Sequence, residues 1–158
     1  GAVRMIEFFA GVIESRAHIS LTSRRDVLYP RLRVTTKRIE LLDYLALHTG
    51  VDTRIDTKGY NRRGCSEHCE ERHIYGSYQS PYWNVDATRA TIVLWNVLPE
   101  LVCQAGNALV ALRTGALTFP NLNAEVPSTM RRLGWELPTR DDLKELLRGT
   151  DSSQSNIA

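Results

Sequence analysis

Apolar residues recur with two different periods in the first part of the chain, and each period predicts a kind of element. Near the N-terminus they stand three and four positions apart, as on one face of a helix. This stripe consists of Ile6, Phe9, Ala10 and Ile13. Residues 18–24 and 29–35 instead alternate residue by residue, which is typical of half-buried strands. Residues 23–26 form a polar turn region, so the two strands are predicted to pair as an antiparallel hairpin.

The same two periods divide the rest of the chain, and residues that commonly cap or end helices mark the boundaries. These boundary residues are Gly50, Pro99, Gly115, Thr139 and Gly149. The predicted order is a helix over 37–48, strands over 51–58 and 74–86, helices over 88–97 and 101–113, a loop over 116–137 and a short helix over 141–148 before a polar, mobile tail.

The composition suits one soluble globular domain. Of the 158 residues, 42% are hydrophobic and 24% are charged, and no run of 18 apolar residues exists that would cross a membrane. The three cysteines are an odd number, which argues against a disulfide scaffold and favours a reducing cytoplasm. One domain with one core and no membrane partner is therefore expected.

Basic residues are concentrated in the N-terminal part, although the net charge is only +2. Residues 1–64 contain 12 Lys or Arg and 7 Asp or Glu, whereas residues 65–158 contain 8 and 11. Within residues 16–38, seven basic residues oppose a single acidic one. This asymmetry favours a surface for a polyanion over an ordinary solvated sheet face, which would more often mix acids with bases.

One face of the predicted hairpin carries arginines among short polar side chains. Its members are Ser20, Thr22, Arg24, Tyr29, Arg31 and Arg33. Arginines bind phosphates, and arginines and short polar side chains can contact base edges in a DNA groove. This face is therefore predicted to bind nucleic acid.

Residues Phe9 to Ala17 form the sequence Phe-Ala-Gly-Val-Ile-Glu-Ser-Arg-Ala, which resembles the LAGLIDADG motif of homing endonucleases. The junctions at 34–37 and 98–101 are also similar to those of that family. The resemblance covers residues 5–113, and a single motif without an internal repeat resembles the homodimers of the family. It implies an α+β fold of order αββαββαα with a four-stranded antiparallel saddle sheet. Residues 114–158 would then form a C-terminal extension.

In that family the motif helices of two subunits pack through small residues, and a two-fold dimer presents two identical faces to an approximately palindromic site. The resemblance therefore implies a homodimer on pseudo-palindromic double-stranded DNA. The implied dimer interface consists of Phe9, Ala10, Gly11 and Ile13. The DNA-binding residues expected beyond the hairpin face are Arg16, Arg25, Thr36, Lys37, Arg54, Lys58, Arg62 and Arg63.

The motif departs from an active nuclease at the position of its metal ligand. Each motif helix of the family presents an acid that binds catalytic magnesium, and that position is Arg16 here. The positions of the water-positioning glutamine and of a late basic residue are Thr36 and Gln104. A guanidinium cannot bind magnesium. The resemblance therefore implies sequence-specific DNA binding without cleavage.

Two alternative functions stay open. An active magnesium-dependent endonuclease could use a relocated catalytic acid, Glu14 or Asp86, although Glu14 points roughly 200° away from Arg16 on a helix. A protein-binding module could keep the fold without DNA contact, but the sheet arginines disfavour it. The expected location is the cytoplasm, at a bacterial nucleoid or in a phage-infected bacterial cell.

A second cluster lies between the third and fourth predicted strands. Two cysteines and two histidines fall within nine residues, and they are Cys65, His68, Cys69 and His73. Thiolate and imidazole ligands suit a tetrahedral zinc ion, although the spacing of the cysteines is tighter than usual. The alternatives are a structural zinc site that pins a long loop and a loop with free thiols and exposed histidines.

Overall fold

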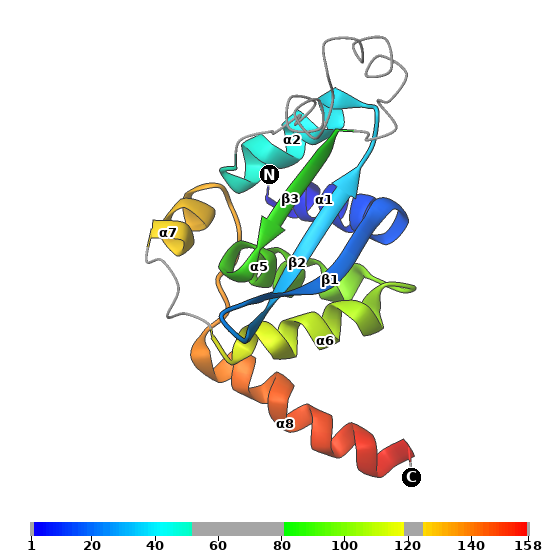
Figure 1. The fold of residues 1–158 in the computed structure, drawn as a ribbon, viewed down its shortest axis with the longest axis vertical. Helices are drawn as coiled ribbons and strands as arrows, with labels where there is room; N and C mark the ends of the chain where they lie inside the picture. The colour runs from blue at the N-terminus through cyan, green and yellow to red at the C-terminus, as the bar shows by residue number, and fades with distance from the viewer. Residues whose placement is uncertain (1, 52–80, 119–124, 158) are drawn as a thin grey trace.

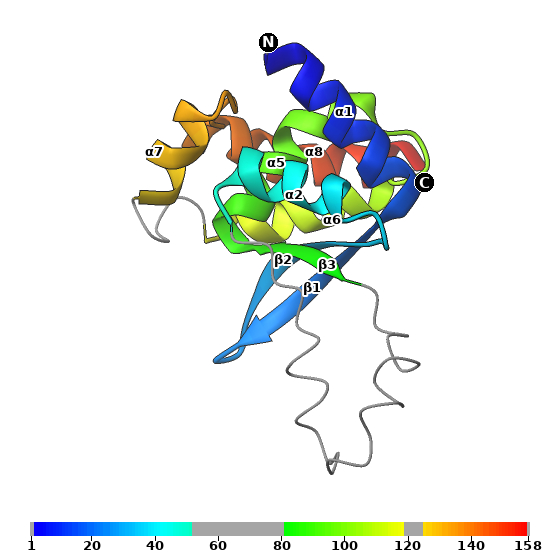
Figure 2. The same cartoon turned by 90° about the horizontal axis from the view of Figure 1, so that it is seen from above.

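The computed structural model describes residues 2–51, 81–118 and 125–157, and it describes side chains as far as residue 148. The described strands form one antiparallel sheet, and the described helices gather on one side of it, as Figures 1 and 2 show from two directions. The mixed α+β class that the sequence predicts is thus confirmed for the described part of the chain.

Helix α1 (Ala2–Arg16) leads directly into strand β1 (Ala17–Arg24), which pairs with β2 (Val27–Thr35). Arg25 and Asp26 join the strands with positive φ angles of 51° and 65°. Two such residues match the twist of a tight two-residue hairpin turn. The predicted helix and hairpin are confirmed, and β2 begins two residues before the predicted start.

Strand β3 (Tyr82–Asp86) completes the described sheet, in the order β1-β2-β3. Its register with β2 places Leu32 opposite Val85 and Val34 opposite Trp83, and these four side chains are buried. The sequence predicts four strands, whereas the described sheet has three. The strand predicted over 51–58 falls, apart from Val51, outside the described residues.

Helix α2 (Ile39–Thr49) ends where the sequence predicts, at Gly50, whose φ is +72° and whose N–H donates to the carbonyl of Ala46. Helix α5 (Ala87–Val97) and the 3-10 turn η2 (Leu98–Glu100) follow β3. Helix α6 (Ala105–Ala116) begins four residues after the predicted start, because a turn occupies residues 101–104.

Gly115 does not end α6 but lies inside it, which corrects the predicted boundary. A Cβ atom there would come within 2.3 Å of the Thr91 hydroxyl and 3.3 Å of the Pro30 ring. Glycine at this position therefore lets α6 approach α5 and the sheet closely.

Two corrections concern the C-terminal part. Helix α7 (Glu125–Arg132) occupies part of the predicted loop, because Pro127 stands in its first turn, where no intrahelical N–H bond is needed. Helix α8 (Arg140–Ile157) is longer than predicted and continues past Gly149 into the predicted mobile tail. A glycine inside a helix costs about 1 kcal/mol, which does not end a helix by itself.

The start of α8 agrees with the sequence. The Asp142 N–H donates to the Thr139 hydroxyl at 3.1 Å, and the Thr139 N–H donates to the Asp142 carboxylate at 2.8 Å. This reciprocal pair is a capping box. None of the described helices is long and apolar enough to cross a membrane.

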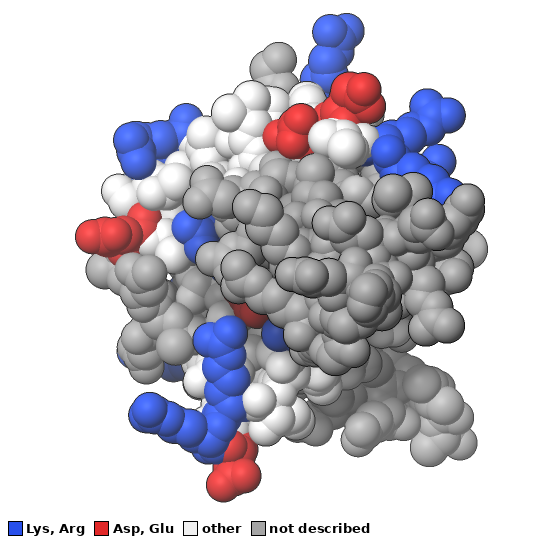
Figure 3. All heavy atoms as spheres, turned by 45° about the horizontal axis from the view of Figure 1, so that its top comes forward, with Lys and Arg blue, Asp and Glu red and all other residues white. Residues whose placement is uncertain are grey.

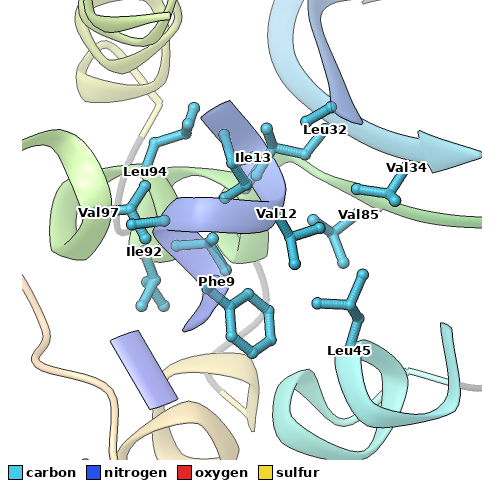
Figure 4. Packing of buried hydrophobic residues seen from close by; sticks show 14 of the residues in the cluster. Phe9, Val12, Ile13, Leu32, Val34, Leu45, Val85, Ile92, Leu94 and Val97 are labelled. Atoms are coloured by element: carbon cyan, nitrogen blue, oxygen red, sulfur yellow. The ribbon is translucent and has the colours of Figure 1, made fainter. Parts of the chain in front are cut away.

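The core lies between the sheet and the helices (Figure 4). Phe9 and Ile13 of α1 are completely buried in it, beside side chains of β2, α2, β3 and α5. Buried residues of the C-terminal segments join the same cluster, and they are Val126, Met130, Trp135 and Leu143. The C-terminal part of the chain therefore packs onto the core of the N-terminal part.

Candidate nucleic-acid interface

The outer face of the sheet is organised in cross-strand rows, because residues directly opposite in antiparallel strands share a face. The rows are Thr22–Tyr29, Ser20–Arg31–Asp86, His18–Arg33–Asn84 and Thr35–Tyr82. This face lies opposite the described helices (Figure 2). It brings together the hairpin residues that the sequence predicts to bind nucleic acid, and it adds the β3 residues Tyr82, Asn84 and Asp86. The alternation of polar and apolar residues over 82–85 could have identified Tyr82 and Asn84 from the sequence.

Arg31 and Asp86 form the best-defined ion pair of this face. The Arg31 Nε atom lies 2.7 Å from Asp86 Oδ1, and Arg31 Nη2 lies 3.3 Å from Oδ2. Hydrogen bonding to this carboxylate raises the pKa of Arg31 above its usual value. Two further groups reach the same carboxylate: Arg24 Nη2 lies 3.7 Å from Oδ2, and Asn84 Nδ2 lies 3.5 Å from Oδ1. Asp86 thus neutralises part of the basic surface.

Arg33 has different surroundings in the neighbouring row. Its guanidinium carbon lies 4.5 Å from the centre of the Tyr82 ring, a cation–π contact. Its Nε atom and the opposite Asn84 Oδ1 atom are buried and have no hydrogen-bond partner in the described part of the chain. The two sheet arginines are therefore not equivalent, although the sequence pattern treats them alike.

A second basic group lies where α1 ends. The exposed Arg16 donates from Nη1 to the hydroxyl of the buried Thr36 at 3.4 Å. The same hydroxyl accepts the backbone N–H of Arg38 at 3.2 Å. Lys37 stands between these residues and is exposed. Arg16, Lys37 and Arg38 thus gather positive charge at the end of α1.

Glu14 has a structural partner rather than a free carboxylate. It accepts the backbone N–H of Val102 and, at 2.8 Å, that of Gln104. The Gln104 side chain in turn donates to the Ala17 carbonyl at 2.8 Å. These bonds tie the end of α1 to the turn before α6. The hydrogen bond from the backbone N–H of Val102 is the largest cause that lowers the pKa of Glu14. The backbone hydrogen bonds from Gln104 and Cys103 act in the same direction.

We expect Glu14→Gln to lower the melting temperature at pH 7, because a glutamine offers one acceptor oxygen to two N–H groups. The folded-state pKa of Glu14 is lowered, so its contribution to stability is complete above the unfolded pKa and is lost as pH falls through the folded pKa. The difference in melting temperature between wild type and variant should therefore become smaller below about pH 4. Thermal melts at pH 7 and pH 3 test this. Glu100→Gln, which changes an exposed carboxylate of η2, should show no such gap.

Three of the four residues of the predicted dimer interface are buried within their own subunit. Phe9 and Ile13 are 0% exposed and Ala10 is 4% exposed, so all three already pack inside their own subunit. The physical reason is that the apolar stripe of α1 faces its own sheet and helices. Gly11 lies on the other face, is exposed and has space for a Cβ atom. Only Gly11 of the four predicted residues is therefore available to a partner.

Several predicted site residues fall outside the described part of the chain, and nothing in the structure tests them. They are Arg54, Lys58, Arg62, Arg63 and the proposed zinc ligands Cys65, His68, Cys69 and His73. Across residues 2–51, 81–118 and 125–157, no group of three or more His, Cys, Asp or Glu side chains could hold a metal ion. Figure 3 shows basic side chains of described residues projecting at several places around this face of the molecule.

A cavity of about 290 Å³ lies beside the end of the sheet. Its lining includes Thr22, Arg24 and Tyr29 of the hairpin, Asp86 at the end of β3 and Arg89 in the first turn of α5. Burial lowers the pKa of Arg89, whose Nε atom donates to the Thr49 carbonyl at 3.1 Å. The polar surface of the outer face therefore extends into this hollow.

The fold is similar to that of a homing endonuclease. I-CvuI in complex with its target (Sro1.3) in the presence of 2 mM Ca matches with a TM-score of 0.50 and 16% sequence identity, over 94% of this chain and 95% of that chain. I-CvuI in complex with the I-CreI target (C1221) in the presence of 2 mM Mg, with the DNA not cleaved, gives 0.49 at the same identity and coverage. No protein-family model matches the sequence, and no curated protein matches it. At this identity the likeness establishes the homing-endonuclease-like fold and nothing finer.

Proposed function

We propose that the protein binds pseudo-palindromic double-stranded DNA as a homodimer and does not cut it. The outer face of the sheet carries this proposal. Its cross-strand rows set arginines among serine, threonine, asparagine and tyrosine, which suits contacts to phosphates and base edges. The fold is similar to that of a homing endonuclease that was solved in complex with its target, which supports DNA as the partner.

The absence of cleavage is inferred from the end of α1. Phosphodiester hydrolysis by metal ions needs ligands that bind a divalent cation. The motif helix instead ends in Arg16, next to Lys37 and Arg38, and this positive charge repels magnesium. The same charge attracts phosphates, so Arg16 would contact the DNA backbone near the two-fold axis.

A relocated active site has less support. Glu14 already accepts two backbone N–H groups, and Asp86 already pairs with Arg31. Either carboxylate would have to give up these partners to bind a metal ion. The endonuclease function therefore remains the alternative that an experiment has to exclude.

The direct test offers the purified protein a pool of random double-stranded DNA, with magnesium and with EDTA. We expect enrichment of an approximately palindromic site, equal affinity in both buffers and intact DNA after incubation with magnesium. Magnesium-dependent cutting by the wild type, lost in Glu14→Gln or Asp86→Asn, would establish the endonuclease instead. A failure to bind any duplex would exclude both functions.

Arg16→Ala should weaken binding and reduce the salt dependence. Each subunit loses one phosphate contact, so the slope of log affinity against log salt should flatten by about two units per dimer. Arg16→Lys keeps the charge and should keep the slope. Arg148→Ala, which removes an arginine of α8 that pairs with Glu145, serves as the control for charge alone. An unchanged slope in Arg16→Ala would exclude this contact.

A further inference from the structure

The Arg31–Asp86 pair has a geometry that leaves one edge of the guanidinium free. Asp86 binds the side edge, through Nε at 2.7 Å and Nη2 at 3.3 Å. A guanidinium has five N–H groups in a planar fork, so the two outer N–H groups of Nη1 and Nη2 remain as a parallel pair. No other partner of this guanidinium occurs among the described residues, and the Arg31 side chain is 29% exposed. The Arg31 side chain is therefore partly open to solvent, and its outer fork has no partner among the described residues.

Asp86 is itself held in place by more than one contact. Asn84 Nδ2 lies 3.5 Å from its Oδ1 atom, and Arg24 Nη2 lies 3.7 Å from its Oδ2 atom. Asp86 also occupies the N-cap position of α5, where an aspartate ordinarily accepts a backbone N–H of the first turn. Its side chain makes no such bond. The Asp86 carboxylate therefore pairs with Arg31 and does not cap α5.

An acid on a DNA-binding face opposes affinity, because it repels phosphates. Its presence is explained if it provides specificity in place of affinity. An arginine that is free to turn would bind phosphates of any sequence, whereas one whose side edge is fixed can present only its outer fork. That fork matches the O6 and N7 acceptors of guanine in the major groove.

We propose that Arg31 recognises one guanine in each half-site and that Asp86 is the positioning residue that holds it for this contact. This assignment rests on the proposed DNA-binding function and deepens it. Asp86 also keeps Arg31 from binding phosphates indiscriminately. Arg24, which is 71% exposed and only approaches the same carboxylate, contacts phosphate.

The test measures base preference at every position of the enriched site, for wild type and variants of the full chain. Wild type should prefer guanine at one position of each half-site by about tenfold to 100-fold. Arg31→Lys keeps the charge but lacks the fork, so it should lose that preference and retain most of its affinity for random duplex. Arg24→Lys is the matched control on the same face and should change no base preference.

Asp86→Asn should change the guanine preference and the affinity for random duplex in opposite directions. The guanine preference should fall, while affinity for random duplex should rise severalfold and its salt slope steepen, because Arg31 becomes free to bind phosphate. A purely structural role of Asp86 would lower both together. If Asp86→Asn does not fold, the base preference of Arg31→Lys still tests the proposal.

The two levels of the proposal fail separately. A wild type that binds a defined duplex without a guanine position that depends on Arg31 overturns this assignment and leaves DNA binding intact. Asp86→Asn with an unchanged guanine preference also overturns it. A wild type that binds no duplex overturns the DNA-binding function and the assignment together.

Discussion

Gly11→Leu is expected to turn the proposed dimer into a folded monomer. Gly11 is exposed on α1, and a Cβ atom there meets nothing within 4 Å in its own subunit. Ser15, one turn later, donates its hydroxyl to the Gly11 carbonyl at 2.8 Å. The side chains on this surface of the helix are therefore small, and the Ser15 hydroxyl already has a hydrogen-bond partner. A second motif helix could therefore approach this surface closely.

Leucine at position 11 would overpack that contact without disturbing the subunit. Overpacking costs about 1–3 kcal/mol, and two-fold symmetry doubles it, so the dimer dissociation constant should rise about 30-fold or more. Sedimentation at micromolar concentration measures the change. Gly106→Leu is the matched control, since Gly106 is also an exposed helical glycine with open space around it. A monomeric wild type, or a variant that dimerises unchanged, would contradict the proposed interface.

The elements that the sequence predicts well are those fixed by local signals. The hairpin follows from alternation, the end of α2 from Gly50, and the start of α8 from the Thr139–Asp142 capping box. The errors arise where tertiary contacts override local preference. Gly115 is required by the close approach of Thr91, and the turn before α6 is held by Glu14, which is 90 residues from Gln104.

The candidate site shows the same limit. Period-two alternation placed Arg31 and Arg33 on one face, as the structure does. It could not show that Asp86 pairs with Arg31, because the two residues are 55 positions apart and meet only through the β2–β3 register. Helical periodicity likewise identified the stripe with Phe9 and Ile13, but periodicity does not say whether a stripe meets its own sheet or a partner.

Phe9→Ala should lower the free energy of unfolding by about 3–5 kcal/mol. Phe9 is 0% exposed, and its ring centre lies 4.8 Å from that of Trp135 and 6.1 Å from those of Tyr44 and Trp83. The loss is a large part of the stability of a domain, which is about 5–15 kcal/mol. Urea unfolding of the wild type and the variant measures it.

The dependence on protein concentration separates a core role of Phe9 from an interface role. A defect inside the subunit lowers the stability by the same amount at every concentration, whereas a lost dimer contact changes the way stability depends on concentration. We expect a constant difference for Phe9→Ala. Phe8→Ala is the control on the same helix, because Phe8 is 43% exposed and its ring contacts only Tyr44 among the described aromatic rings, at 4.6 Å. It should cost about 0.5–1.5 kcal/mol. If Phe9→Ala were monomeric and its subunit stability were unchanged, Phe9 would belong to the dimer interface and not to the core.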